Sequence, residues 1–163
     1  MNTWSMRPAR AEDVEDLAEL RVVAMRDDLV RLGIYDEERV RQRMRNRFLP
    51  AHTSVIEADG AFVGCVALIP NADVPLAGHG HEVGEGEGFW LESFYLAPGT
   101  QGRGLGTAVL RTLMERADAD GVPVRLQCLI GSAAVRLYER EGFTVMSETP
   151  YDVWMIRQPR VRA

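Results

Sequence analysis

Three glycines at alternate positions stand where a strand-like segment gives way to a helix-like one. Residues 101–107 read QGRGLGT. Residues 89–96 before them (FWLESFYL) are rich in aromatic side chains and lie between Gly88 and Pro98, which is typical of a strand. Apolar residues then recur at helical spacing, at Leu105, Val109, Leu110, Leu113, Met114 and Ala117. The chain is therefore constrained to pass from strand to helix through a glycine-rich loop.

Such a loop suits an anion. Glycine lacks Cβ, so backbone N–H groups can converge on a ligand, and a helix start adds unpaired N–H donors and a positive dipole end. Two common phosphate loops do not match. The dinucleotide fingerprint would need glycine where Thr107 stands, and the Walker loop would need Gly-Lys-Ser/Thr, which the chain lacks. An ordinary glycine-rich turn is the alternative.

Two segments carry a family resemblance. Residues 96–106 (LAPGTQGRGLG) resemble the acyl-CoA loop of the GNAT superfamily of N-acetyltransferases, in which a proline precedes Gln/Arg-x-x-Gly-x-Gly/Ala. Residues 134–143 (AVRLYEREGF) resemble the family's helix that ends in Leu-Tyr-Glu-x-x-Gly-Phe. The opening Met6–Ala9, followed by an acidic helix, is also typical of the family. The resemblance thus spans nearly the whole chain.

The resemblance implies an α/β GNAT fold. We expect a single mixed, mostly antiparallel sheet of six to seven strands, flanked by about four helices, with a splay between the fourth and fifth strands. One N-acetyltransferase domain would span residues 1–158, and residues 159–163 would form a loose tail. The residue pattern predicts strands at 4–6, 53–58, 61–69, 89–96, 124–130, 143–147 and 152–156, and helices from about 12 to 33, 36 to 48, 105 to 121 and 132 to 141.

Composition limits the classes of function. Apolar residues make up 46 % and charged residues 26 % of the 163 positions, which are ordinary values for one globular domain. We expect neither a membrane span nor a secretory leader, and the net charge of −5 argues against a nucleic-acid partner. Cys65 and Cys128 lie in apolar, strand-like segments. We expect buried thiols in a cytoplasmic protein, and no disulfide or metal pair.

The resemblance implies acetyl-CoA as the co-substrate. The pantetheine arm would add like a strand beside the backbone of Phe94, Tyr95 and Leu96, and the acetyl group would lie in the gap between this segment and residues 124–128. Backbone N–H groups near Leu96 would polarise the thioester carbonyl, as an oxyanion hole does. The pyrophosphate would contact Gln101, Gly102, Arg103, Gly104, Leu105, Gly106 and Thr107.

One position departs from the family pattern. Many members carry asparagine seven residues before the motif tyrosine, where it contacts the pantetheine, but this chain has Gly131. Ser132 either supplies a substitute hydroxyl to CoA or caps the following helix, and capping carries more weight.

The resemblance names Tyr138 as the general acid that protonates the departing sulfur. A phenol is protonated at neutral pH and can donate to a thiolate. The alternative is an aromatic residue that only packs a helix on the sheet. Glu92 is a candidate general base, acting through a water, because simple strand alternation places it on the face of Phe94. A surface carboxylate, or a strand bulge that reverses the facing, is the alternative, and Ser93 is a weaker candidate for orienting the water.

Two further segments have two interpretations each. The glycine-rich segment 78–88 carries two histidines and three glutamates; we expect no metal there, but an acidic loop that would favour a cationic amine if it borders the acceptor. The helix at 36–48 presents an apolar stripe flanked by arginines. A solvated helix face is the simpler interpretation, and recognition of an anionic acceptor group is the other. The arginines are Arg39, Arg43 and Arg47 on one side of the stripe and Arg41 and Arg45 on the other.

Two classes of function remain at this point. The first is an N-acetyltransferase that acetylates an amine of a small molecule, peptide or protein. The second is a GNAT-like module that binds acyl-CoA without turnover, as a sensor or regulatory subunit. A homodimer is possible, and the acceptor carries no signature in the sequence.

Overall fold

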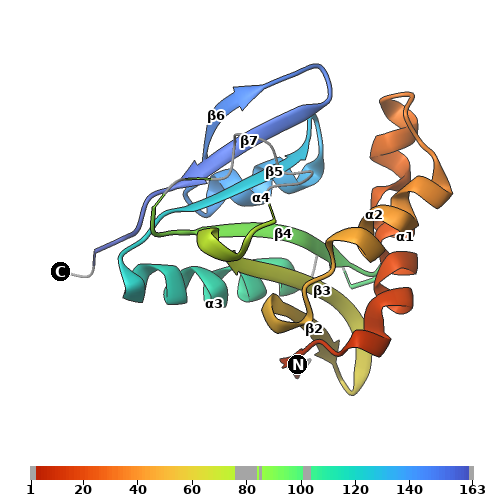
Figure 1. Cartoon of the computed structure of the whole chain (residues 1–163), viewed down its shortest axis with the longest axis horizontal. Coiled ribbons are helices and arrows are strands. Elements are labelled where there is room, and N and C mark those ends of the chain that lie inside the picture. Colours follow the sequence, from red (N-terminus) through yellow and green to blue (C-terminus); the bar gives the residue numbers. More distant parts are fainter. Residues whose placement is uncertain (1–2, 76–83, 85, 101–103, 162–163) are drawn as a thin grey trace. The chain divides into compact units, whose positions relative to one another are not determined.

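The computed structural model describes residues 3–75, 84, 86–100 and 104–161 (Figure 1). The chain falls into two compact units. The first unit comprises Met1–Ala67 and Ser93–Leu105, and the second comprises Leu68–Glu92 and Gly106–Ala163. The boundary passes through two strands, between residues 67 and 68 and between residues 92 and 93, so each of these strands is divided between the two units.

Seven strands form one mixed sheet in the order β1-β2-β3-β4-β5-β7-β6. The pair β4·β5 is parallel, whereas β1·β2, β2·β3, β5·β7 and β6·β7 are antiparallel. The described residues also contain four α-helices, so the expected α/β GNAT fold with seven strands is confirmed. The expected splay between β4 and β5 stays a prediction.

The first unit is built from a hairpin, an edge strand and two helices. β1 (Trp4–Pro8) pairs with β2 (Thr53–Ala58), and β2 pairs with β3 (Ala61–Pro70). The hairpin turns at Asp59 and Gly60, whose φ angles of 51° and 81° are the left-handed values that a tight two-residue turn requires. α1 (Val14–Arg31) packs against α2 (Glu37–Arg47), which Asp36 caps by accepting from the backbone N–H of Arg39 at 3.1 Å.

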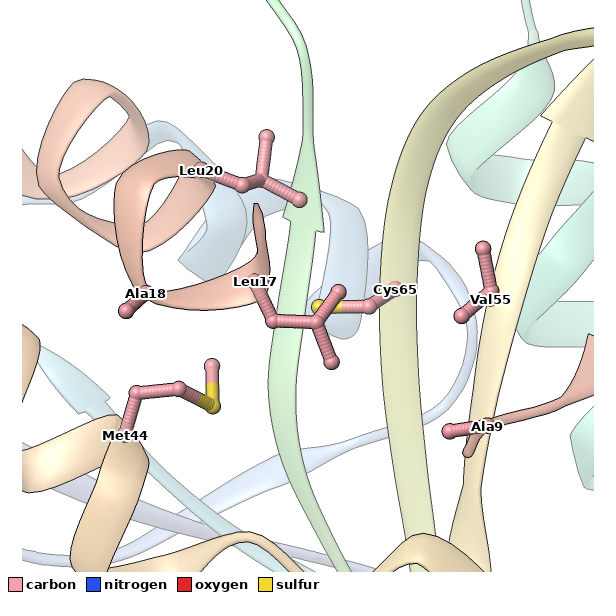
Figure 2. Packing of buried hydrophobic residues seen from close by; sticks show 7 residues of the cluster. All are labelled: Ala9, Leu17, Ala18, Leu20, Met44, Val55 and Cys65. Atoms are coloured by element: carbon pink, nitrogen blue, oxygen red, sulfur yellow. The ribbon is translucent and has the colours of Figure 1, made fainter. Parts of the chain in front are cut away.

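A hydrophobic cluster joins these helices to the strands of the first unit. Figure 2 shows Leu17 of α1 reaching the strand that carries Cys65, while Met44 enters from α2. Phe48, Tyr95 and Ala97 pack against the cluster from outside. Its buried members are Ala9, Leu17, Ala18, Leu20, Met44, Val55 and Cys65.

The second unit contains the start of β4 (Phe89–Leu96), which pairs with β5 (Val124–Leu129) through residues 89–91. α3 (Leu105–Asp120) and α4 (Ala133–Arg140) precede β5 and β6 (Thr144–Glu148), respectively. β7 (Asp152–Arg157) lies between β5 and β6 in the sheet. Three short 3₁₀ turns complete the described elements of the chain, at Ala11–Asp13, Pro50–His52 and Asn71–Asp73.

Both cysteines are free thiols, but they differ in exposure. Cys65 is fully buried, whereas Cys128 is half-buried, so the expectation of two buried thiols is wrong for Cys128. Cys128 lies near the carboxyl end of β5, where the strict burial of alternate residues ends after Leu126. Within the described residues, no helix has both the length and the apolar character needed to cross a membrane.

Candidate active site

The last residues of β4 are the expected pantetheine-binding segment, and a strained residue precedes them. Ser93 has a φ of 54°, a left-handed value that non-glycine residues rarely adopt. Phe94, Tyr95 and Leu96 follow it and are half-buried. The left-handed residue interrupts the simple alternation of side chains, so alternation cannot place Glu92 and Phe94 on one face.

The side chain of Tyr95 is held by a hydrogen bond. The expected contact of this residue with the pantetheine arm is therefore made by its backbone. Arg21 of α1, which is 9 % exposed, donates through Nε to the Tyr95 hydroxyl at 3.1 Å and through Nη1 to the Val40 carbonyl at 2.8 Å. Ala97 N–H then donates to the Val63 carbonyl at 2.7 Å. The end of β4 is thereby fixed to α1, α2 and β3 within the first unit.

Gly64 of β3 allows this segment to approach closely. A Cβ at position 64 would lie 2.5 Å from the Tyr95 carbonyl oxygen and 2.8 Å from Leu96 Cδ2. Since real Cβ atoms are not found at such distances, only glycine fits the observed backbone.

The expected pyrophosphate loop is described only in part. Gln101, Gly102 and Arg103 lie outside the described residues. Gly104 has a φ of 79°, a Cβ at its position would meet nothing within 4 Å, and α3 begins at the next residue. Leu105, Gly106 and Thr107 form the first turn of α3, so the strand-to-helix transition predicted at this loop is present.

Glu92 is held by a neighbour on its own strand. Trp90 Nε1 donates to Glu92 Oε1 at 2.8 Å, which shows that the two side chains share a face of β4. Trp90 is 2 % exposed, whereas Glu92 is half-buried. The carboxylate therefore has a fixed orientation and retains access to solvent or a ligand.

Tyr138 lies in the last turn of α4 and is 6 % exposed. Its ring meets the Phe143 ring edge-on, with the centroids 5.5 Å apart. Phe143 N–H also donates to the Tyr138 carbonyl at 3.0 Å, and Gly142 between them has a φ of 99°. The Leu-Tyr-Glu-x-x-Gly-Phe pattern is thus a helix end whose aromatic residues hold each other in place.

Ser132 begins the same helix. Its Oγ accepts from Ala134 N–H at 3.2 Å, which is the N-cap interaction that the sequence favoured. Gly131, which replaces the family's asparagine, has a φ of 74°. The cap uses the acceptor capacity of the Ser132 hydroxyl and leaves its proton available for another contact.

A polar sheet face in the second unit was not singled out in the sequence. Arg125 pairs with Trp90 of β4 in the parallel register, and Trp154 of β7 lies opposite Gln127. Because paired residues and residues two apart share a face, these side chains and Glu92 lie on one side of the sheet. We call Trp90, Glu92, Arg125, Gln127 and Trp154 the Arg125 face. The alternation of polar and apolar residues in 124–128 (VRLQC) was the available signal.

A pocket of about 920 Å³ also lies in the second unit, near the amino end of β4. Arg116 of α3 stacks over the Phe89 ring there, 4.9 Å from its centroid. None of its lining residues is an expected catalytic or CoA-binding residue. The lining comprises Pro70, Asn71, Ala72, Gly84, Gly86, Glu87, Gly88, Phe89, Arg116, Asp120 and Val122.

Ion pairs with α1 explain the arginines on one side of the arginine-rich helix α2. Arg41 donates to Glu19 of α1 at 2.6 Å, and Arg45 donates to Glu15 at 2.9 Å. Val40 and Met44 of the apolar stripe are buried. The interpretation as a solvated face over the core therefore accounts for Arg41 and Arg45.

In the acidic segment 78–88, both histidines and two of the three glutamates, Glu82 and Glu85, lie outside the described residues.

Comparison with known proteins identifies the family. The model of the acetyltransferase (GNAT) family matches residues 15–143, and the chain therefore belongs to the GNAT acetyltransferase family. No curated protein sequence matches it.

Solved structures share the fold at low sequence identity. The PaiA N-acetyltransferase of Thermoplasma acidophilum, in complex with coenzyme A, has a TM-score of 0.70 and 19 % identity, over 96 % of this chain and 99 % of that one. An N-acetyltransferase of Staphylococcus aureus Mu50 has a TM-score of 0.66 and 23 % identity, over 93 % and 99 %. N-acetylglutamate synthase of Neisseria gonorrhoeae, with coenzyme A and N-acetyl-glutamate, has a TM-score of 0.62 and 19 % identity, over 97 % of this chain and 35 % of that one.

Proposed function

We propose that this protein transfers an acetyl group from acetyl-CoA to a primary amine by direct attack in a ternary complex. The observation that carries the proposal is the position of Tyr138, which lies at the family motif's helix end and is fixed there by Phe143. Two of the proteins that share the fold were solved with coenzyme A, which supports CoA as the donor. The free thiols Cys65 and Cys128 suit a reducing cytoplasm, which we include in the proposal.

The donor contacts follow the family pattern. The backbone of Phe94, Tyr95 and Leu96 holds the pantetheine arm, and the Ser132 hydroxyl donates to it from the start of α4. The pyrophosphate binds at the glycine loop of residues 101–107, where the open backbone of Gly104 and the start of α3 offer N–H donors.

The chemistry requires one proton to leave and one to arrive. A bound ammonium first loses one proton to solvent, and Glu92, through a water, then removes the proton that the neutral amine loses as it becomes an amide. The amine nitrogen forms a bond to the thioester carbon while backbone N–H groups near Leu96 stabilise the negative oxygen. The C–S bond then breaks, and the Tyr138 hydroxyl protonates the departing sulfur, so that the products are the N-acetyl amine and free CoA.

The role of Tyr138 is tested by Tyr138→Phe, which removes the hydroxyl and retains the ring packed on Phe143. We expect the dissociation constant of CoA to remain unchanged and kcat to fall about 10²-fold, because a general acid typically contributes at least that much. Tyr35→Phe is the matched control, since the Tyr35 hydroxyl accepts from Arg26 Nε at the exposed surface. Unchanged turnover in Tyr138→Phe would remove this residue from the mechanism.

The role of Glu92 is tested by Glu92→Gln. The amide oxygen can still accept from Trp90 Nε1, so the strand geometry is retained while the basic oxygen is lost. We expect kcat/KM to fall about 10²-fold while the dissociation constant of CoA stays unchanged. The exposed Glu148→Gln on β6 serves as the control. A variant that keeps the wild-type kcat/KM would show that another group is the base.

Release of CoA thiol from acetyl-CoA, measured across a panel of amines, separates the enzyme from a binding module. Acceptor-dependent release supports the transferase. Tight binding of acetyl-CoA with no release for any amine would support the non-catalytic sensor or regulatory module instead.

A further inference from the structure

The Arg125 face contains two buried hydrogen-bond donors, Arg125 Nε and Trp154 Nε1. Neither Arg125 Nε nor Trp154 Nε1 has an acceptor within the part of the chain that the structure describes. Buried donors are paired in nearly all native structures, so each exception calls for a physical explanation. Both donors lie on adjacent strands and on the same side of the sheet, which suggests a common explanation.

The register brings these donors close together. Trp154 is opposite Gln127, and Arg125 is two residues from Gln127 along β5. Such diagonal neighbours on antiparallel strands are within reach of long and aromatic side chains. The backbone of Gly84 lies against the Arg125 guanidinium, because a Cβ at position 84 would collide with Arg125 Nη1. The arginine is therefore confined to the sheet face and cannot extend past Gly84.

The positive charge of this face lies on Arg125. Among the described residues, no carboxylate forms an ion pair with Arg125. Glu92 is the carboxylate on this face, and it already accepts from Trp90 Nε1. Arginine remains charged at every relevant pH, and a partly buried guanidinium favours a planar anion that accepts two parallel hydrogen bonds. Tryptophan Nε1 can only donate. An anion that accepts from both groups would satisfy them together.

We propose that Arg125 and Trp154 bind a carboxylate on the acceptor, so that the substrate is a small amino-acid-like amine. The proposal rests on the transferase function proposed above. Glu92 lies on β4 beside β5, and neighbouring strands are about 4.8 Å apart, so one small molecule can present its amine to Glu92 and its carboxylate to Arg125. The opposite charges of Glu92 and Arg125 match the two ends of such a zwitterion.

Turnover tests the substrate class with matched amines. L-alanine, β-alanine and L-phenylalanine are each compared with their carboxamides, which retain the amine and lose the negative charge; phosphoethanolamine supplies a phosphate instead. We expect a KM at least about 10-fold lower for the best carboxylate than for its amide, the usual effect of a charged hydrogen bond. Preference for the amides or for phosphoethanolamine would overturn the carboxylate assignment.

Variants test the two residues. Arg125→Met should bring the KM ratio between amide and carboxylate close to one by raising the KM for the carboxylate alone, and Trp154→Phe should reduce the ratio in part. Arg125→Lys retains the charge but loses the planar fork, and we expect an intermediate ratio. Arg116→Met is the control, because Arg116 stacks on Phe89 away from this face. A ratio that is unchanged in folded Arg125→Met or Arg125→Lys would overturn the proposal.

Direct binding separates this inference from the transferase function. In ¹H–¹⁵N spectra of the CoA-bound wild-type protein, β-alanine should shift the Nε1–H signal of Trp154 and the Nε–H signal of Arg125, whereas β-alaninamide should not. These shifts without thiol release would support the carboxylate site while contradicting the transferase. Thiol release from amines without these shifts would support the transferase and overturn the carboxylate site.

Discussion

Arg157 carries a positive charge into the interior of the second unit, where its side chain is 3 % exposed. Nη1 and Nη2 donate to the two oxygens of Asp118 at 2.8 and 3.0 Å, and Nε donates to the Glu141 carbonyl at 3.1 Å. This pair holds the end of β7 to α3 and to the end of α4, the helix that carries Tyr138.

Asp118→Asn should destabilise the protein by about 3 kcal/mol, because it leaves the buried charge of Arg157 without a counter-charge. Urea unfolding at pH 7 measures the free energy of unfolding. Asp120→Asn, at an exposed position on the same helix, is the control. An equal loss in both variants would show that the pair has no special role.

The same pair gives the stability of the protein a defined pH dependence. Arg157, followed by the backbone N–H of Arg160, holds the pKa of Asp118 below its usual range. The unfolded chain therefore binds the proton more readily, so the stabilisation is complete above the ordinary carboxyl pKa of about 4 and is lost as pH falls through the folded value. The difference in the free energy of unfolding between wild type and Asp118→Asn should accordingly shrink as the pH is lowered from 5.

Single residues were predictable from the sequence where a local pattern defines them. Tyr138 and Gly104 follow from motifs, and their helix-end and helix-start positions agree with the structure. A strand bulge near Glu92 was an alternative in the sequence analysis, but that Ser93 takes the left-handed backbone was not predictable, since serine has no preference for it. Arg125 and Trp154 come together only through strand pairing across almost thirty positions of the chain.

Elements were predicted best where turn chemistry marks their ends. Residues 53–58 and 89–96 form strands with the expected bounds, and Asp59-Gly60 forms the expected turn. The position of β7 between β5 and β6 was not predicted. Local patterns specify a closing hairpin, but which of its two strands meets β5 depends on long-range packing.

Ser132 caps α4, the helix that carries Tyr138. Replacing it with alanine removes the N-cap of α4, an eight-residue helix, and should lower the free energy of unfolding by about 1 kcal/mol. Ser132→Asn retains a side-chain cap and should recover most of that loss. Both free energies are measured by denaturant unfolding, and equal losses in the two variants would contradict capping.

The same variants show whether the Ser132 hydroxyl also contacts CoA. Asparagine restores the helix cap but replaces the hydroxyl that would donate a hydrogen bond to CoA. A raised KM for acetyl-CoA in both variants would support the contact, and an unchanged KM in Ser132→Asn would restrict Ser132 to capping.

For the whole molecule, ligand binding should appear as thermal stabilisation. A ligand that binds the native state at 100 times its dissociation constant adds about 2.7 kcal/mol, which corresponds to roughly 5–10 °C for a chain of this size. We expect CoA to raise the melting temperature of the wild type and of Tyr138→Phe equally. Pantetheine, which lacks the phosphates, should give a smaller shift at the same concentration. Equal shifts for both compounds would contradict a pyrophosphate contact at the glycine loop.

All basic residues of the chain other than histidine are arginines, since the sequence contains no lysine. Arginine side chains do not deprotonate in proteins, so they are not acyl acceptors under assay conditions. Thiol release in the presence of an added amine can therefore be assigned to that amine without subtracting acetylation of lysine side chains.

Cys65 gives the first unit an internal reporter of its own opening. Burial raises the pKa of its thiol to about 12, and Sγ donates to the Ser93 carbonyl at 3.1 Å. Thiol reagents attack the thiolate, so the closed protein protects this sulfur both by pKa and by lack of access. The slow phase of labelling at Cys65 consequently measures how often β3 parts from the left-handed residue that precedes the expected CoA-binding segment. A ligand that holds that segment should slow the labelling in proportion to its occupancy.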